Sequence, residues 1–188
     1  DLNHPCQALS DLLTIQEKKR RLKGIKIAYV GDGNNVTNSL IEAAAKMGMT
    51  IAVGCPLGYQ PDRGIVDRAR EEARQTGAVI EIGADPFVAV KDADVVYTDV
   101  WISMGQEREQ AKRLKTLAPY QLNARLLKCA KPDALVMHCL PAHRGEEISA
   151  EVLDGPQSVV FDQAENRLHM QKAILVRLLG RNLHGARK

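Results

Sequence analysis

Short apolar runs rich in β-branched residues alternate along the chain with longer stretches of helical periodicity. The runs occupy residues 25–30, 50–53, 79–82, 94–98, 134–137 and 158–161, and the helical stretches occupy residues 5–20, 36–48, 62–76, 121–129 and 163–180. Strands that alternate with helices pair in parallel, and the connecting helices cover the two faces of the sheet. The pattern predicts a doubly wound α/β fold with a mainly parallel, Rossmann-like sheet.

The last predicted helix is amphipathic, since Leu168, Leu175, Leu178 and Leu179 fall on one face at helical spacing. Prolines fall between the predicted elements, which supports their boundaries. No repeat, low-complexity tract or interdomain linker interrupts the pattern. The 188 residues are therefore expected to form one domain.

Composition argues against several classes of protein. The net charge is only +3, and the densest basic run, residues 18–23, lies at a predicted helix end where cations are favourable, so no nucleic-acid partner is expected. No apolar stretch approaches the roughly 18 residues that span a bilayer. The four cysteines show neither a paired framework nor a Cys-x-x-Cys spacing, which predicts free thiols in the reducing cytoplasm.

A glycine-rich loop, Gly-Asp-Gly-Asn-Asn at residues 31–35, follows the first strand and opens a helix. A dinucleotide fold holds its pyrophosphate at this point. The third glycine of that fingerprint is absent, however, and no acidic residue closes the second strand. The loop therefore favours a doubly wound domain with another ligand over an NAD-dependent enzyme, and no cofactor is expected.

Four polar segments follow predicted strands, at residues 31–35, 99–107, 138–145 and 164–167. In open parallel sheets ligands gather outside the carboxyl ends of the strands, so the segments are expected to form one site. Asp99 and Ser103 can accept the protons of an amine, Asn35 can bind a carboxylate or an amine, and Arg167 can hold a developing oxyanion. These groups suit a small zwitterion.

Cys139 lies between histidines in sequence and close to Arg144. Positive neighbours lower the pKa of a thiol, which favours a thiolate, while a buried structural cysteine remains the alternative. The residues His138, Cys139 and His143 lack the spacing of a structural zinc site, so no metal is expected.

His4 and Gln7 flank a proline at the entrance of the first predicted helix, and their spacing lets both side chains point the same way from its first turn. Taken alone, the segment is equally consistent with capping or packing.

Together these segments resemble the ornithine carbamoyltransferase family over nearly the whole chain. Residues 4–7 resemble the His-Pro-x-Gln segment that grips the carbamoyl group, and residues 138–141 resemble the His-Cys-Leu-Pro signature that contacts the reacting δ-amino group. The resemblance implies catalytic roles for His4, Gln7, Cys139 and Arg167. It implies substrate binding by Asn35, Asp99, Ser103, Met104 and Leu140.

The implied reaction is attack of the neutral δ-amine of ornithine on the carbonyl of carbamoyl phosphate, without metal or cofactor. The family's phosphate-binding Ser-Thr-Arg-Thr-Arg segment does not occur in the sequence. Residues 1–188 are therefore expected to be the ornithine-binding domain, with the amino-terminal carbamoyl-phosphate domain absent and a homotrimer expected for the full-length enzyme. The alternatives are a non-catalytic ornithine-binding fragment and a putrescine carbamoyltransferase.

Overall fold

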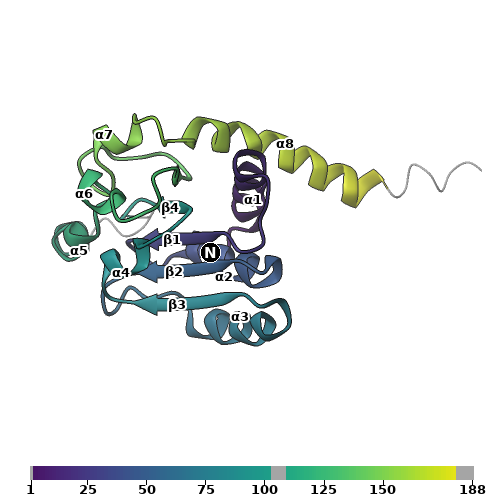
Figure 1. The fold of residues 1–188 in the computed structure, drawn as a ribbon, viewed down its shortest axis with the longest axis horizontal. Helices are drawn as coiled ribbons and strands as arrows, with labels where there is room; N and C mark the ends of the chain where they lie inside the picture. Colours follow the sequence, from purple (N-terminus) through teal and green to yellow (C-terminus); the bar gives the residue numbers. More distant parts are fainter. Residues whose placement is uncertain (1, 103–108, 181–188) are drawn as a thin grey trace, which may run out of the picture.

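A five-stranded parallel sheet forms the centre of the molecule (Figure 1). The computed structural model describes residues 2–102 and 109–180. The strand order is β3-β2-β1-β4-β5 and every neighbouring pair is parallel, which confirms the predicted doubly wound α/β fold. The strands are β1 (Lys26–Val30), β2 (Thr50–Gly54), β3 (Val79–Gly83), β4 (Val95–Thr98) and β5 (Leu135–His138).

Helices cover both faces of the sheet. The described helices are α1 (Pro5–Lys19), α2 (Asn35–Met47), α3 (Arg63–Thr76), α4 (Pro86–Val90), α5 (Gln110–Leu117), the 3-10 helix η2 (Ala118–Tyr120), α6 (Ala124–Leu127), α7 (Ala150–Leu153) and α8 (Val160–Leu179). Helices α1, α2 and α3 share one apolar cluster with the sheet, and α4, α6 and α7 share the other.

Strand β1 shows why the central runs are apolar without alternation. Ile27 and Tyr29 point into the cluster beneath α1–α3, whereas Ala28 and Val30 point into the opposite cluster. All four side chains are buried because both faces of the sheet are covered.

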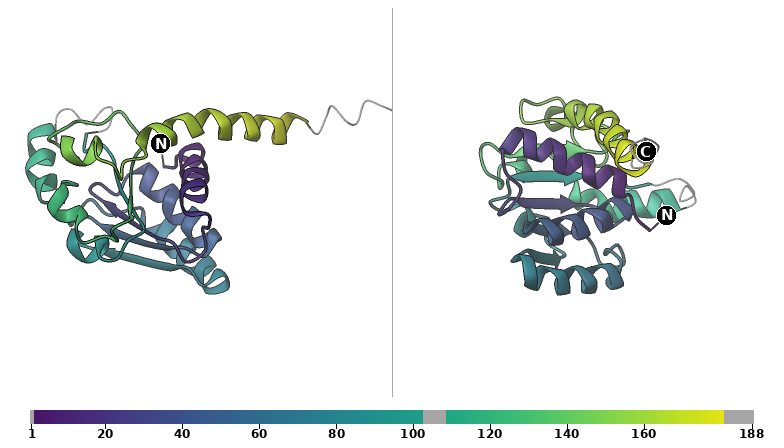
Figure 2. Two further views of the ribbon diagram at one scale, coloured as in Figure 1. Left: turned by 45° about the horizontal axis from the view of Figure 1, so that its top comes forward. Right: turned by 90° about the vertical axis from the view of Figure 1, so that its right-hand side faces the viewer.

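The first and last helices, α1 and α8, lie side by side although they stand at opposite ends of the chain (Figure 2). Asn166 on α8 donates hydrogen bonds from Nδ2 to Thr14 Oγ1 at 3.0 Å and to Glu17 Oε2 at 2.7 Å, both on α1. This pairing brings two segments of the predicted site together.

One prediction near the carboxyl end is wrong. Residues 158–161 form no strand; Ser158 makes an isolated bridge to Val136, and α8 begins two residues later. The predicted amphipathic helix is present as α8, but its leucine face is exposed: the accessible fractions of Leu168, Leu175, Leu178 and Leu179 lie between 56% and 69%. The carboxyl-terminal part of α8 projects beyond the body of the molecule (Figure 1).

None of the described helices combines the length and the apolar character needed to cross a bilayer.

Candidate functional site

The sheet reverses its strand order between β1 and β4. From β1 the chain continues to β2 and β3 on one side, whereas β4 and β5 lie on the other. Connections that leave two adjacent parallel strands in opposite directions open a crevice at their carboxyl ends, where ligands bind. The loop at residues 31–35 and the carboxylate of Asp99 both lie at this reversal.

The glycines of the 31–35 loop serve packing inside the protein. Gly31 has φ +123°, and a Cβ on Gly33 would stand 2.4 Å from the backbone nitrogen of Pro61. A side chain at either position would therefore be strained or blocked. The backbone conformation at Gly31 and the close packing at Gly33 are therefore sufficient to explain why glycines occur in this loop.

Asn34 joins the loop after β1 to the end of β4. Its Oδ1 caps α2 by accepting from Val36 N at 3.0 Å and Thr37 N at 3.2 Å, so Nδ2 is turned outward and donates to Asp99 Oδ2 at 2.6 Å. The sequence pattern pointed to Asn35 and did not distinguish Asn34 as the residue that contacts Asp99. Asn35, at the first position of α2, is half-buried and makes no side-chain hydrogen bond within residues 2–102 and 109–180.

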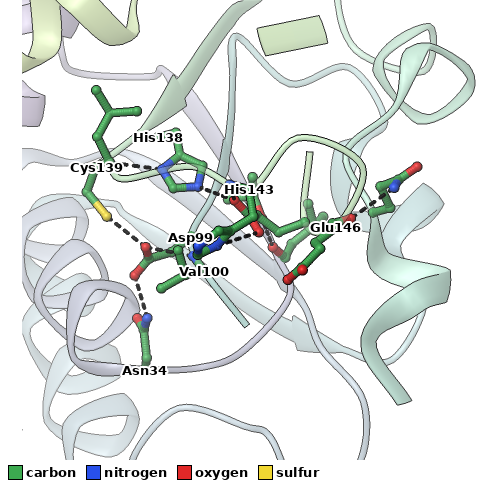
Figure 3. Close-up of polar contacts among 12 residues, drawn as sticks. Asn34, Asp99, Val100, His138, Cys139, His143 and Glu146 are labelled. Atoms are coloured by element: carbon green, nitrogen blue, oxygen red, sulfur yellow. Dashed lines mark hydrogen bonds and ion pairs between the residues drawn. The ribbon is translucent and has the colours of Figure 1, made fainter. Parts of the chain in front are cut away.

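Asp99 lies between Asn34 and Cys139 (Figure 3). The Cys139 thiol donates from Sγ to Asp99 Oδ1 at 2.9 Å, and Asp99 itself is only 6% exposed. Burial, together with the Asp99 carboxylate, raises the pKa of Cys139 far above its usual range. The predicted thiolate is therefore wrong, and Arg144 gives it no support because that side chain is exposed and paired with Asp154 at 2.8 Å.

His138 and Glu147 fix the segment that carries Cys139 and Leu140. Leu140 N donates to His138 Nδ1 at 2.9 Å, so Nδ1 is the unprotonated nitrogen and Nε2 donates to Glu147 Oε1 at 3.1 Å. Both side chains are wholly buried. Asp99, His138 and Cys139 could offer ligands to a metal ion, but these hydrogen bonds already occupy both nitrogens of His138.

A second group of site residues comes from the pairing of α1 with α8. Arg167 donates from Nη1 to Gln7 Oε1, and Gln7 is 1% exposed. The Nε of Arg167 is buried and finds no acceptor in the part of the chain that the structure describes. Arg167 therefore has an unused donor inside the molecule.

His4 links the two groups. It precedes α1, and its backbone nitrogen donates to Ser39 Oγ at 2.7 Å. Its pKa is lowered by burial and by Arg167, and the carboxylate of Asp99 acts in the opposite direction. His4 therefore lies within electrostatic reach of both side chains. Ser103 and Met104 lie outside the described residues.

Comparison with known protein families shows to which family the chain belongs. Residues 23–178 match the family model for the aspartate/ornithine carbamoyltransferase Asp/Orn binding domain. The chain belongs to this carbamoyltransferase family. The resemblance predicted from its motifs is thereby confirmed.

The chain is closely similar to several ornithine carbamoyltransferases. It is 59% identical to the ornithine carbamoyltransferase of Geobacillus stearothermophilus over 95% of its length, and 62% identical to that of Syntrophus aciditrophicus over 93%. The solved ornithine carbamoyltransferase of Pyrococcus furiosus superimposes with a TM-score of 0.90 at 56% identity, over 94% of this chain and 56% of that one. The chain spans only 58% and 57% of the two curated relatives.

Proposed function

We propose that this chain is the ornithine-binding half of an enzyme that transfers the carbamoyl group of carbamoyl phosphate to the δ-amine of L-ornithine, giving citrulline and phosphate. The observation that carries the proposal is the buried Asp99 carboxylate, held by Asn34 and Cys139 at the strand reversal of the sheet. The names of the similar proteins support ornithine as the amino acid.

The amino acid is bound around Asp99. The Asp99 carboxylate is the partner for the α-ammonium of ornithine. The rest of the amino-acid end of the substrate is assigned to Asn35, Ser103 and Met104. Cys139 and Leu140 contact the δ-amine. A substrate held in this way loses its translational and rotational freedom on binding and not during the reaction.

The carbamoyl carbonyl is polarised by His4, Gln7 and Arg167. The unused Nε donor of Arg167 and the positive charge of its guanidinium suit a developing oxyanion. Because the thiol of Cys139 stays protonated, its role is to donate a hydrogen bond, and it does not accept the proton that the δ-ammonium loses before attack.

We further propose that the chain acts together with an amino-terminal, carbamoyl-phosphate-binding domain. The chain matches only 58% and 57% of the length of two ornithine carbamoyltransferases, which supports a second domain in the full-length enzyme. The sequence also contains no Ser-Thr-Arg-Thr-Arg segment, the family's phosphate-binding motif. The motif resemblance also supports a homotrimeric full-length enzyme in the cytoplasm. A chain without that domain binds ornithine and performs no transfer.

Two measurements test the function. The full-length enzyme should form citrulline from ornithine and carbamoyl phosphate, and the isolated chain should form none. Putrescine, which lacks the α-carboxylate and has two equivalent amines, should be a poor substrate of the full-length enzyme. Carbamoylation of putrescine faster than of ornithine would refute the proposal, and so would citrulline formation by the isolated chain at a normal enzyme rate.

Two replacements of Cys139 distinguish a role as a hydrogen-bond donor from a role as a thiolate. Serine keeps a donor to Asp99, so Cys139→Ser should change the KM for ornithine by no more than about fivefold. Alanine removes the donor, and loss of a hydrogen bond to a charged group costs about 1.5–3 kcal/mol, so Cys139→Ala should raise the KM about 10- to 100-fold. Steady-state kinetics of both variants over a pH range provides the measurement.

The pH–rate profiles should show no thiol ionisation near neutrality in the unmodified enzyme. If the serine variant lost as much activity as the alanine variant, together with one limb of its profile, Cys139 would be acting as a thiolate.

A further inference from the structure

Helix α1 carries a buried carboxylate, Asp11, that has no part in the function proposed above. It lies one helical turn after Gln7, is 0% exposed, and faces α8 and strand β4. A buried carboxylate is costly unless its oxygens accept hydrogen bonds, so its partners indicate its role.

All three of its partners act as donors to the carboxylate. Oδ1 accepts from Gln7 Nε2 at 2.8 Å and from Gln163 Nε2 at 2.7 Å, and Oδ2 accepts from the Tyr97 hydroxyl at 3.2 Å. These partners belong to α1, α8 and β4, so Asp11 joins three elements of the site.

The bond to Asp11 determines which way the Gln7 amide faces. With Nε2 turned to Asp11, the carbonyl Oε1 faces α8 and accepts from Arg167 Nη1. A flipped amide would place its NH₂ group against the guanidinium, where two donors meet and the bond is lost. The orientation of Gln7, and with it the position of Arg167, therefore depends on an acceptor at Asp11 Oδ1.

The second amide extends the network to the other half of the site. Gln163 Nε2 donates to Asp11, and its Oε1 accepts from the backbone nitrogen of His138 at 3.0 Å. His138 directly precedes Cys139 in the chain. The same acceptor atom thus positions groups on both sides of the candidate site.

We propose that Asp11 is a positioning residue whose Oδ1 fixes the Gln7 amide and thereby aligns Arg167 for carbonyl polarisation. This proposal rests on the proposed function for its catalytic consequence. It assigns Asp11 no contact with substrate.

The positioning does not require the negative charge. Burial raises the pKa of Asp11 to about 7, and its hydrogen bonds and Arg167 act in the opposite direction; Tyr97 and Cys139 also lie within its electrostatic reach. A proton on Oδ2 would leave Oδ1 free to accept from both glutamines. Asparagine can adopt the same arrangement, with Nδ2 directed to the Tyr97 oxygen.

Three variants of the full-length enzyme test the proposal. Asp11→Asn should keep kcat within about threefold, because its carbonyl replaces Oδ1. Asp11→Ala should lower kcat about 10- to 100-fold with a smaller change in the KM for ornithine. The Gln7 amide loses the acceptor that orients it toward Arg167, whereas Gln163 Nε2 keeps the Tyr97 hydroxyl as a second partner at 3.0 Å. If the alanine variant does not fold, Asp11→Ser replaces it, since its hydroxyl is polar but too short to reach Gln7.

Thr14→Val is the matched control. Thr14 is buried one turn further along α1 and also bonds α8, through Asn166, but it lies outside the network. The control should keep kcat within about threefold. Equal losses of kcat for Asp11→Asn and Asp11→Ala, or a loss for Thr14→Val as large as that for Asp11→Ala, would overturn the proposal.

A structural readout distinguishes this proposal from the proposed function. In nuclear magnetic resonance spectra, the side-chain amide protons of Gln7 should exchange slowly with water in the unmodified protein and in Asp11→Asn, and faster in Asp11→Ala. Unchanged exchange in Asp11→Ala refutes the positioning. Slow exchange in a protein that makes no citrulline refutes the proposed function and supports the positioning.

Discussion

Replacement of Asp99 with asparagine should weaken ornithine binding by about 30-fold or more and leave the affinity for carbamoyl phosphate within about threefold. Asp99 is almost fully buried and held by Asn34 and Cys139, so it is preorganised for an ammonium group. Removing one partner of a buried charge pair costs about 2–5 kcal/mol, and each 1.4 kcal/mol is tenfold in affinity. Equilibrium binding of each substrate to the full-length enzyme gives the two constants.

Asp94→Asn is the matched control for this substitution. Asp94 is also buried, but it lies at the opposite end of β4, where it accepts from Lys131 and from the backbone of Lys26. Its replacement should affect stability and spare both affinities. Equal weakening of both substrates by Asp99→Asn would assign Asp99 a different role.

Arg167→Met should lower kcat about 100- to 1,000-fold while the KM for ornithine changes by less than about fivefold. Methionine keeps much of the length of arginine but removes the charge and the donors. Loss of one preorganised donor to a developing oxyanion has a kinetic cost of this size. Steady-state kinetics with each substrate varied in turn provides the measurement.

Arg144→Met serves as its control, since Arg144 lies on the segment after β5 but is exposed and paired with Asp154. An exposed ion pair contributes little, so kcat should stay within about twofold. A rise in the KM for ornithine with an unchanged kcat for Arg167→Met would place Arg167 in amino-acid binding.

The sequence predicted β1, β2, β4 and β5 because each is a short run of buried, mainly apolar residues. Strand β3 was predicted from its Val and Ile residues, although it contains Glu81 and lies half-exposed at the edge of the sheet. A sixth strand was wrongly predicted at residues 158–161, because this run is also mainly apolar. In the structure Val160 is the first residue of α8 and packs in the second apolar cluster. The short helices α4, α5 and α7 were missed because four to eight residues contain too little periodicity to be distinguished from loops. In these segments the secondary structure depends on tertiary contacts and not on the local sequence pattern.

At the site, residue types were easier to predict than their partners. The alternation of strands and helices placed Asp99 at the correct sheet edge, whereas the choice between Asn34 and Asn35 depended on which amide caps α2. The pKa of Cys139 was misjudged because neighbours in sequence were treated as neighbours in space: Arg144 is paired with Asp154, and Asp99 contacts the thiol. The network of Asp11, Gln163 and Tyr97 has no local signature at all.

The pairing of α1 with α8 has a consequence for protein synthesis. Gln7 and Arg167 are 160 residues apart, and Asp11 and Gln163 are 152 apart. A nascent chain can form β1 to β4 and their connecting helices while it is still attached to the ribosome, and α1 can already pack against α2, but α1 lacks its second partner until α8 has been released. We expect the contacts of Gln7 and Asp11 with α8 to form last, so a prematurely terminated chain would retain most of the sheet together with His4 and Gln7, but would lack Arg167 and Gln163.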